Sequence, residues 1–163
     1  MKSPKVIADP IYGIIDVRPV LPMIDTREFQ ALDDKRQLGM SYLTFPSATH
    51  SRKAHSLGAY HAARELAERW IKRGFISQRE GDALAGYALY HDIGHPPFSH
   101  VTEPLCELPA DALGDATTRR AIKGMSVNSA LSFAIIRRRR AEIEAAGTDL
   151  WQPGRGELAH RQP

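Results

Sequence analysis

Four side chains that can bind a metal ion or move a proton lie within residues 90–100, YHDIGHPPFSH. They are His91, Asp92, His95 and His100. An apolar helical pattern over residues 83–89 leads into this stretch, and a glycine and two prolines end it. His91 and Asp92 would point about 100° apart in a regular helix, but both can reach one point where the last turn unwinds. Imidazole with carboxylate favours a divalent ion such as Zn, Mn, Fe, Ni or Mg.

A third candidate ligand comes from an earlier helix, which the pattern predicts over about residues 51–73, ending at Gly74. His55 lies four residues before Ala59, and therefore on the same predicted inward face. A buried histidine bonded to a carbonyl is the alternative. Together with the His-Asp pair, His55 would let three ligands from two helices converge on one cation. The predicted apolar stripe of this helix is Ala59, Ala62, Ala63, Leu66 and Trp70, with Ala67 and Ile71 beside it.

The helix that carries the His-Asp pair is predicted over residues 77–92. Ser77 followed by Glu80 fits a capping box, in which each side chain bonds the other residue's backbone. The interior of this helix is apolar nearly all round, so we expect it to be the central buried helix of the fold.

Upstream of these helices, residues 5–18 predict a small β-hairpin or an extended arm. Two prolines, at positions 19 and 22, are expected to keep helix out until Asp25. A helix is then predicted from Asp25, as N-cap with Glu28 reaching back, to Gly39, followed by a loop or a short extended piece over residues 40–49. The inward side chains of this helix are expected to be Phe29, Leu32 and Leu38.

Downstream of the His-Asp pair, a short helix is expected to begin at Phe98 or Ser99 and to end before Pro104. Residues 107–124 predict a loop with one or two helical turns, and a last helix is predicted over residues 126–146. That helix carries four arginines, at 137–140. They could bind phosphate or nucleic acid, or form a solvated face in which Arg140 pairs with Glu144.

Composition bounds the class of protein. The 163 residues are 42% hydrophobic and 25% charged, which suits one domain with a hydrophobic core. We expect an all-α bundle of about five helices over residues 1–147 and a flexible tail over 148–163.

The remaining composition bears on location and partners. The single Cys106 excludes a disulfide framework and favours a cytoplasmic location. No apolar stretch approaches the roughly 20 residues that span a bilayer, so no membrane partner is expected. A net charge of +3 and a pI near 9.2 fit an anionic ligand such as a nucleotide or nucleic acid, or simply a slightly basic surface.

Three ordered blocks resemble the HD superfamily of metal-dependent phosphohydrolases. The first is His91-Asp92, then His95, then PPFSH; the second is RQLG at 36–39 with FPSATHSRKAHSLG at 45–58; the third is DPIYG at 9–13 with IDTREFQ at 24–30. More narrowly, they resemble the deoxynucleoside triphosphate triphosphohydrolases, which include bacterial dGTPases and the SAM-and-HD-domain dNTPase of vertebrates. The resemblance covers roughly residues 5–105, and three blocks in order are far more specific than an HD pair alone.

The resemblance implies a divalent metal ion held by His55, His91 and Asp92. It places His95 near the α-phosphate, where an imidazole could protonate the leaving group; a supporting hydrogen bond is the alternative. It implies that Arg52 grips the substrate phosphates through parallel hydrogen bonds.

Four further positions carry over from the same resemblance. Gln37 and Leu38 match residues that contact sugar and base. His100 matches a histidine near the substrate, and Glu103 stands where the vertebrate enzyme has an aspartate that orients a catalytic histidine. A local structural role is the alternative for each of these four positions and for Arg52.

The sequence also departs from the family pattern. The family's fourth metal ligand is an aspartate on a later helix, and only Asp111, Asp115 and Asp149 follow here, none in a good helical pattern. A downstream catalytic His-Glu pair is replaced by Val127-Asn128-Ser129. The chain therefore resembles the N-terminal part of such an enzyme, or a shortened relative with weakened metal binding or turnover.

These observations support one leading hypothesis: hydrolysis of deoxynucleoside triphosphates to deoxynucleoside and triphosphate. One alternative is an HD phosphohydrolase acting on another phosphate ester. Another is a catalytically weak HD module that binds nucleotide, nucleic acid or a partner. Relatives of this type form oligomers, and a chain this short is expected to expose apolar helix faces that need a partner, such as a second copy.

Overall fold

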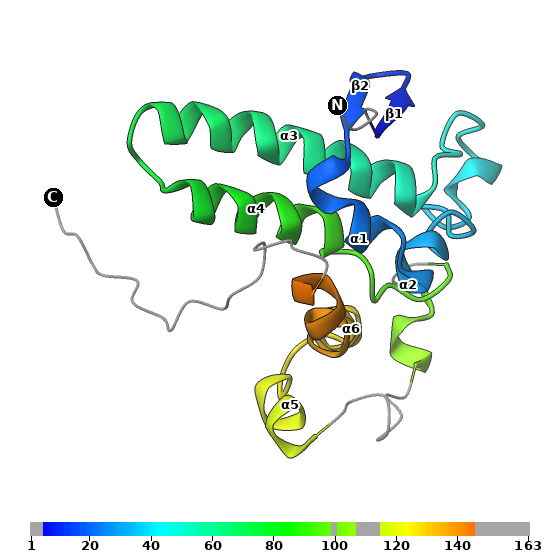
Figure 1. The fold of residues 1–163 in the computed structure, drawn as a ribbon. Helices are drawn as coiled ribbons and strands as arrows, with labels where there is room; N and C mark the ends of the chain where they lie inside the picture. Colours follow the sequence, from blue (N-terminus) through cyan, green and yellow to red (C-terminus); the bar gives the residue numbers. More distant parts are fainter. Residues whose placement is uncertain (1–4, 99–100, 107–114, 146–163) are drawn as a thin grey trace, which may run out of the picture.

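The structure is a computed structural model and describes residues 5–98, 101–106 and 115–145. Within these residues the fold is six α-helices and a small antiparallel hairpin (Figure 1), which confirms the predicted all-α class. No helix in this described part is both long and apolar enough to cross a membrane. The predicted tail over 148–163 lies outside it.

The predicted hairpin is confirmed. β1 (Val6–Asp9) pairs with β2 (Gly13–Asp16) in antiparallel register. The carboxylate of Asp9 accepts hydrogen bonds from the backbone of Ile11 and Tyr12 at 2.8 and 2.9 Å, and these close the turn. The Tyr12 ring lies over Gly58, where a Cβ would come within 2.8 Å of it, so the hairpin packs closely on α3.

Helix begins earlier than the prolines were expected to allow. A 3₁₀ turn, η1 (Arg18–Val20), leads directly into α1 (Leu21–Ile24). Both begin with a proline in their first two positions. A helix start leaves its first N–H groups unbonded, so a proline there loses nothing and has a suitable φ. The expectation that these prolines exclude helix was wrong.

The predicted helix over residues 25–39 is also wrong, because only α2 (Arg27–Gln30) forms. Its N-cap is Thr26, whose hydroxyl accepts from Phe29 N; Asp25 instead ends α1. Phe29 and Leu32 are buried as predicted, but Leu38 is 49% exposed. The two turns that follow, and the 3₁₀ turn η2 (Ser41–Leu43), form a loop.

Backbone pairing explains why this helix stops. Lys35 O accepts from Arg52 N at 2.8 Å, and Gln37 N donates to His50 O at 3.0 Å. Residues 35–37 therefore bond to the segment that begins α3 and cannot also form a helix.

Helices α3 (Arg52–Lys72) and α4 (Gln78–Tyr90) form an antiparallel pair and match the predicted ranges (Figure 1). Ser51 caps α3, Gly74 follows it with φ +72°, and the Ser77/Glu80 capping box is present.

The predicted apolar stripe of α3 was wrong. Leu66 and Trp70 are 41% and 38% exposed, while Ala67 is buried. Near the loop that joins the two helices, α4 approaches α3 through Gly81, where a Cβ would lie 2.8 Å from Ile71 and 3.2 Å from Ala67. That contact sets which side of α3 is covered. The residues of α3 that are buried are Arg52, Ser56, Leu57, Gly58, Tyr60 and Ala67.

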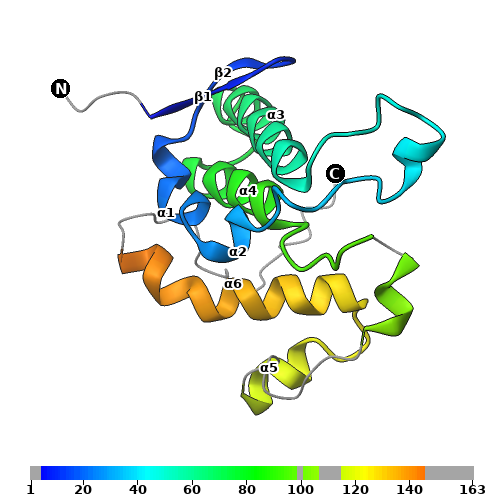
Figure 2. The ribbon, with the colours of Figure 1, turned by 90° about the vertical axis from the view of Figure 1, so that its right-hand side faces the viewer.

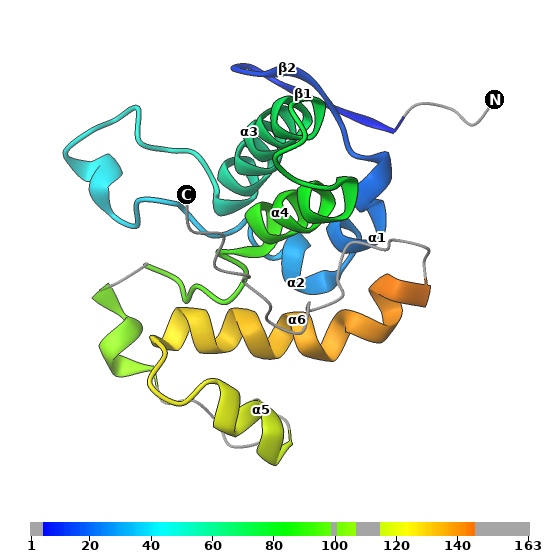
Figure 3. The ribbon, with the colours of Figure 1, turned by 90° about the vertical axis from the view of Figure 1, so that its left-hand side faces the viewer.

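Helix α6 (Val127–Ala145) crosses beneath α1, α2 and α4, and α5 (Ala116–Ala121) lies below it (Figures 2 and 3). Both agree with the predicted last helix and the predicted helical turn before it. α4 lies between α3 and α6, as expected for the central helix. Arg139 pairs with Glu28 through two hydrogen bonds of 2.9 and 3.1 Å, so part of the arginine run ties α6 to α2.

The segment after α4 differs from its prediction. Phe98 has φ +63°, a left-handed conformation in which no right-handed helix begins. The short helical piece that follows is η4 (Glu103–Leu105), a 3₁₀ turn that contains Pro104 instead of ending before it. Proline fits there because it occupies the second position of the turn.

Candidate metal centre

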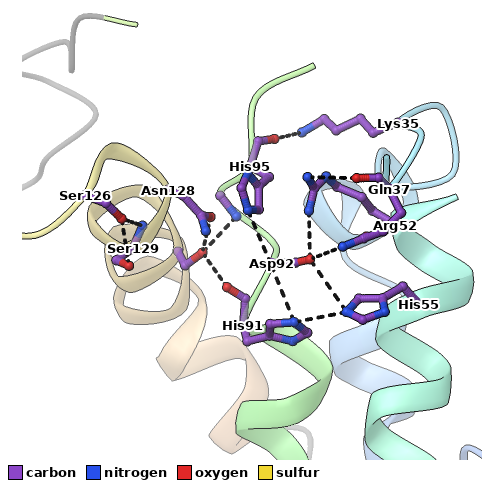
Figure 4. A network of polar contacts seen from close by, with 12 residues as sticks. Lys35, Gln37, Arg52, His55, His91, Asp92, His95, Ser126, Asn128 and Ser129 are labelled. Carbon is purple, nitrogen blue, oxygen red and sulfur yellow. Dashed lines mark hydrogen bonds and ion pairs between the residues drawn. The ribbon is translucent and has the colours of Figure 1, made fainter. Parts of the chain in front are cut away.

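The three predicted metal ligands lie together where α3 begins and α4 ends (Figure 4). The Nε2 atoms of His55 and His91 are 3.3 Å apart. Oδ1 of Asp92 is 3.5 Å from His91 Nε2, and Oδ2 is 3.9 Å from His55 Nε2. One donor atom from each residue fits within 4.8 Å of the others. Ligands that each lie about 2.0–2.2 Å from one ion have such separations.

The chain conformation after α4 brings the pair to one point. His91 is the C-cap of α4, and residues 91–94 continue as turns in which Ile93 N donates to Tyr90 O at 3.1 Å. His95 N donates to Asp92 O at 3.1 Å. The helix therefore gives way at the pair, and the two side chains converge instead of diverging by 100°.

A hydrogen bond to the backbone selects the tautomer of His91 that can bind a cation. Its Nδ1 lies 2.8 Å from Ala88 O. A carbonyl can only accept, so Nδ1 carries the proton and Nε2 presents its lone pair toward His55 and Asp92. Burial lowers the pKa of His55 and outweighs the opposing effect of Asp92, which favours the neutral imidazole that a metal requires. The donor set thus fits a divalent ion.

Asp92 is buried and held ionised by several neighbours. Arg52 Nη1 donates to its Oδ2 at 2.7 Å, and Gln37 Nε2 donates to the same oxygen at 3.0 Å. Burial opposes ionisation, but the Gln37 hydrogen bond and the charge of Arg52 hold the pKa of Asp92 below its usual 3.8. Oδ1 faces His91 and His95, each at 3.5 Å.

A cavity of about 540 Å³ opens over this group. One part of its wall is polar and basic and contains the metal ligands, while another part is apolar. The residues that line it are Gln37, Leu38, Gly39, Met40, Ser41, Arg52, His55, His91, Asp92, His95, Phe98 and Val101. The size is that of a small-molecule site. Seven of the nine site residues that the sequence predicted line this cavity.

The backbone of the 91–95 turn is fixed from two sides. Gly94 N donates to Ser132 Oγ of α6 at 2.9 Å, and Ser132 Oγ donates to His91 O at 3.2 Å. A Cβ on Gly94 would lie 2.3 Å from Ser132 N, so the turn lies directly on α6. On the other side, Lys35 Nζ donates to His95 O at 2.9 Å. No motif marked Lys35 or Ser132, because neither belongs to a pattern with a known chemistry.

Other predicted residues are not placed at the cavity. His100 lies outside the described residues, as does the side chain of Glu103. Of the downstream aspartates, Asp115 caps α5 by accepting from Thr118 N at 2.8 Å and lies 3.6 Å from Arg137. Residues 127–129, which the sequence comparison set against the family's His-Glu pair, begin α6, and Asn128 Oδ1 lies 3.4 Å from Ser132 Oγ.

Residues 52–144 match the family model described as HD domain. This match covers more than half of the chain, so the protein belongs to the HD domain family.

Curated relatives include YwfO, an uncharacterized protein of Bacillus subtilis, 37% identical over 135 residues, which are 77% of this chain and 31% of the relative. The deoxynucleoside triphosphate triphosphohydrolase SAMHD1 of Gallus gallus is 44% identical over 102 residues, 60% of this chain and 16% of that enzyme. The chain thus spans less than a third of the length of either.

Among solved structures, a phosphohydrolase from Bacteroides thetaiotaomicron matches with a TM-score of 0.61 and 29% identity over 90% of this chain and 33% of the other. A hypothetical protein from Aquifex aeolicus matches with a TM-score of 0.55 and 33% identity, over 90% and 38% respectively. This chain thus covers less than two fifths of either solved structure.

Proposed function

We propose that this chain carries a metal-dependent phosphohydrolase site that acts on deoxynucleoside triphosphates and releases deoxynucleoside and triphosphate. The observation that carries the proposal is the convergence of His55, His91 and Asp92 in the lining of a cavity of about 540 Å³. The similarity to the triphosphohydrolase of Gallus gallus supports the choice of substrate.

The reaction adds water at the α-phosphorus and breaks its bond to the 5′ oxygen of the sugar. A divalent ion held by His55, His91 and Asp92 would polarise a phosphate oxygen and lower the pKa of a bound water. The departing 5′ oxygen needs a proton. His95 lies at the cavity wall, and its imidazole supplies that proton in the proposed reaction.

The other cavity residues bind and orient the substrate in this proposal. Arg52 places a buried positive charge beside the phosphates. Gln37 fixes Asp92 and faces the sugar, while Leu38 and Phe98, about half exposed, offer apolar surface to the base.

The test incubates the protein with Mn²⁺ and each of the four deoxynucleoside triphosphates. We expect equal amounts of deoxynucleoside and tripolyphosphate, measured by chromatography, and none from a His91→Ala/Asp92→Ala variant. Orthophosphate or a nucleoside monophosphate as the product would instead support the alternative, an HD phosphohydrolase of another phosphate ester.

A binding module without hydrolysis is the second candidate. It is favoured by Asp115, which caps α5 and is the one described downstream aspartate, so no fourth carboxylate joins the group within the described residues. In this case calorimetry shows that the protein binds Mn²⁺ and nucleotide, but the protein hydrolyses no nucleotide.

A further inference from the structure

Lys35 connects three parts of the molecule that are distant in the sequence. Its carbonyl accepts from Arg52 N at 2.8 Å, which ties it to the first turn of α3. Its ammonium donates to His95 O at 2.9 Å, 60 residues further along the chain (Figure 4). It therefore holds the turn that carries His95 against the loop and the helix that carry Gln37 and Arg52.

The contact acts on the peptide groups that set the direction of the His95 ring. His95 N is held by Asp92 O at 3.1 Å, and His95 O is held by Lys35. With both backbone groups fixed, φ and ψ of His95 are fixed too, and ψ is already restricted because Pro96 follows. His95 as a whole is 4% exposed, with Nε2 3.5 Å from Asp92 Oδ1.

Burying part of a charged lysine side chain costs free energy, which suggests that Lys35 has a function at this position. Its side chain is half-buried, and burial together with the charge of Arg52 lowers the pKa of Lys35. A hydrogen bond from an ammonium to a carbonyl is stronger than one between neutral groups, which makes it suited to holding a backbone segment.

We infer that Lys35 is a positioning residue, which aims the His95 imidazole at the reacting phosphate by fixing the His95 carbonyl. This inference rests on the proposed function, in which His95 acts on the substrate. Lys35 is absent from the cavity wall, so it acts through His95 and not by contact with substrate.

The test compares Lys35→Met with Lys53→Met. Lys53 is a matched control because it lies in the first turn of α3, next to Arg52, and donates to Gln30 and Asp33, not to the 91–95 turn. For Lys35→Met we expect kcat to fall about tenfold or more, since a misplacement of about 1 Å is costly. KM and the Mn²⁺ Kd should stay within about twofold. Lys35→Arg should recover part of kcat, and Lys53→Met should match the parent.

A second readout does not depend on hydrolysis. NMR of ¹⁵N-labelled histidine rings, with His95 assigned through a His95→Gln variant, should show the His95 signals shifted in Lys35→Met and unchanged in Lys53→Met. If the parent hydrolyses no nucleotide, the proposed function fails. The NMR signals of the His95 ring still show whether Lys35 orients that ring.

Two results would overturn the inference. A rise in KM at constant kcat would make Lys35 a phosphate-binding residue, and unshifted His95 signals with unchanged kcat would make the contact purely structural. If Lys35→Met does not fold, Lys35→Gln replaces it, because glutamine is too short to keep the same contact; the same loss is expected.

Discussion

Arg52 and Asp92, 40 residues apart in the sequence, form a buried ion pair with Nη1 and Oδ2 at 2.7 Å. The two residues are 2% and 6% exposed. Replacing Arg52 by methionine leaves a buried carboxylate without its charged partner. We therefore expect Arg52→Met to lower the free energy of unfolding by about 3–5 kcal/mol.

Urea denaturation of the metal-free protein measures this loss. Arg18→Met is the control, because Arg18 and Asp16 form a pair of 2.6 Å on the surface, where solvent screens the charges. Its stability should change little. Equal losses in the two variants would mean that burial adds nothing to the Arg52–Asp92 pair.

Metal binding should stabilise the fold through His55, His91 and Asp92. Mn²⁺ at about 100 times its Kd should add about 2.7 kcal/mol to the free energy of unfolding, since an ion that binds only the folded state shifts the equilibrium by mass action. A chelator should remove the gain. His91→Ala should weaken Mn²⁺ binding by at least about 100-fold in calorimetry.

His61→Ala is the matched control for the metal. His61 lies on α3 six residues past His55, on another face of the helix, where it contacts Glu65 and the ring of Tyr12 instead of the cavity. It should bind Mn²⁺ like the parent. Unaltered binding in His91→Ala would rule out the three-ligand centre.

The sequence predicted α3, α4 and α6 well, because local signals define their ends. Ser51 and Ser77 cap two of them, and Gly74 ends the first with φ +72°. The same reasoning failed at residues 31–39, where the pattern favours helix but residues 35 and 37 pair with the chain before α3. Long-range pairing overrides a local preference and leaves no trace in the local pattern.

The sequence predicted those site residues whose side chains have a recognisable chemistry. His55, His91 and Asp92 carry side chains that suit a cation, and their spacing was informative once two helices were assumed. Lys35 and Ser132 act on backbone groups of the 91–95 turn. Any donor at the right place could do this, so residue type alone could not identify them.

Ser132 should stabilise both the fold and the metal centre. Ser132→Ala removes the acceptor of the buried Gly94 N and the donor to His91 O. An unsatisfied buried N–H costs about 1–3 kcal/mol. Loss of support behind a ligand typically weakens metal binding by about tenfold or more.

Urea denaturation and Mn²⁺ calorimetry check both effects. Ser129→Ala, three residues earlier on the exposed side of α6, is the control and should change stability by no more than about 0.5 kcal/mol. If Ser132→Ala lowers stability but leaves the Mn²⁺ Kd unchanged, Ser132 supports only the packing of α6.

The link between α2 and α6 should give the protein a measurable acid sensitivity. Burial alone would raise the pKa of Glu28, but the hydrogen bonds and charge of Arg139 and the charge of Arg138 outweigh it and hold that pKa below the usual 4.5. A carboxylate with a lowered folded-state pKa stabilises the fold fully above its unfolded pKa. This contribution should be lost as the pH falls below about 4.5 and through the folded-state value.

Unfolding free energies measured in urea from pH 7 to pH 3 test this link. Arg139→Met should cost about 1–2 kcal/mol at pH 7 and should lose less than the parent on acidification. Arg138→Met is the control, because its side chain is 74% exposed and lies 3.6 Å from Glu28. Glu28→Gln should remove the same acid-dependent part as Arg139→Met. Identical pH profiles for the parent and Glu28→Gln would show that the α2–α6 pair does not contribute to acid unfolding.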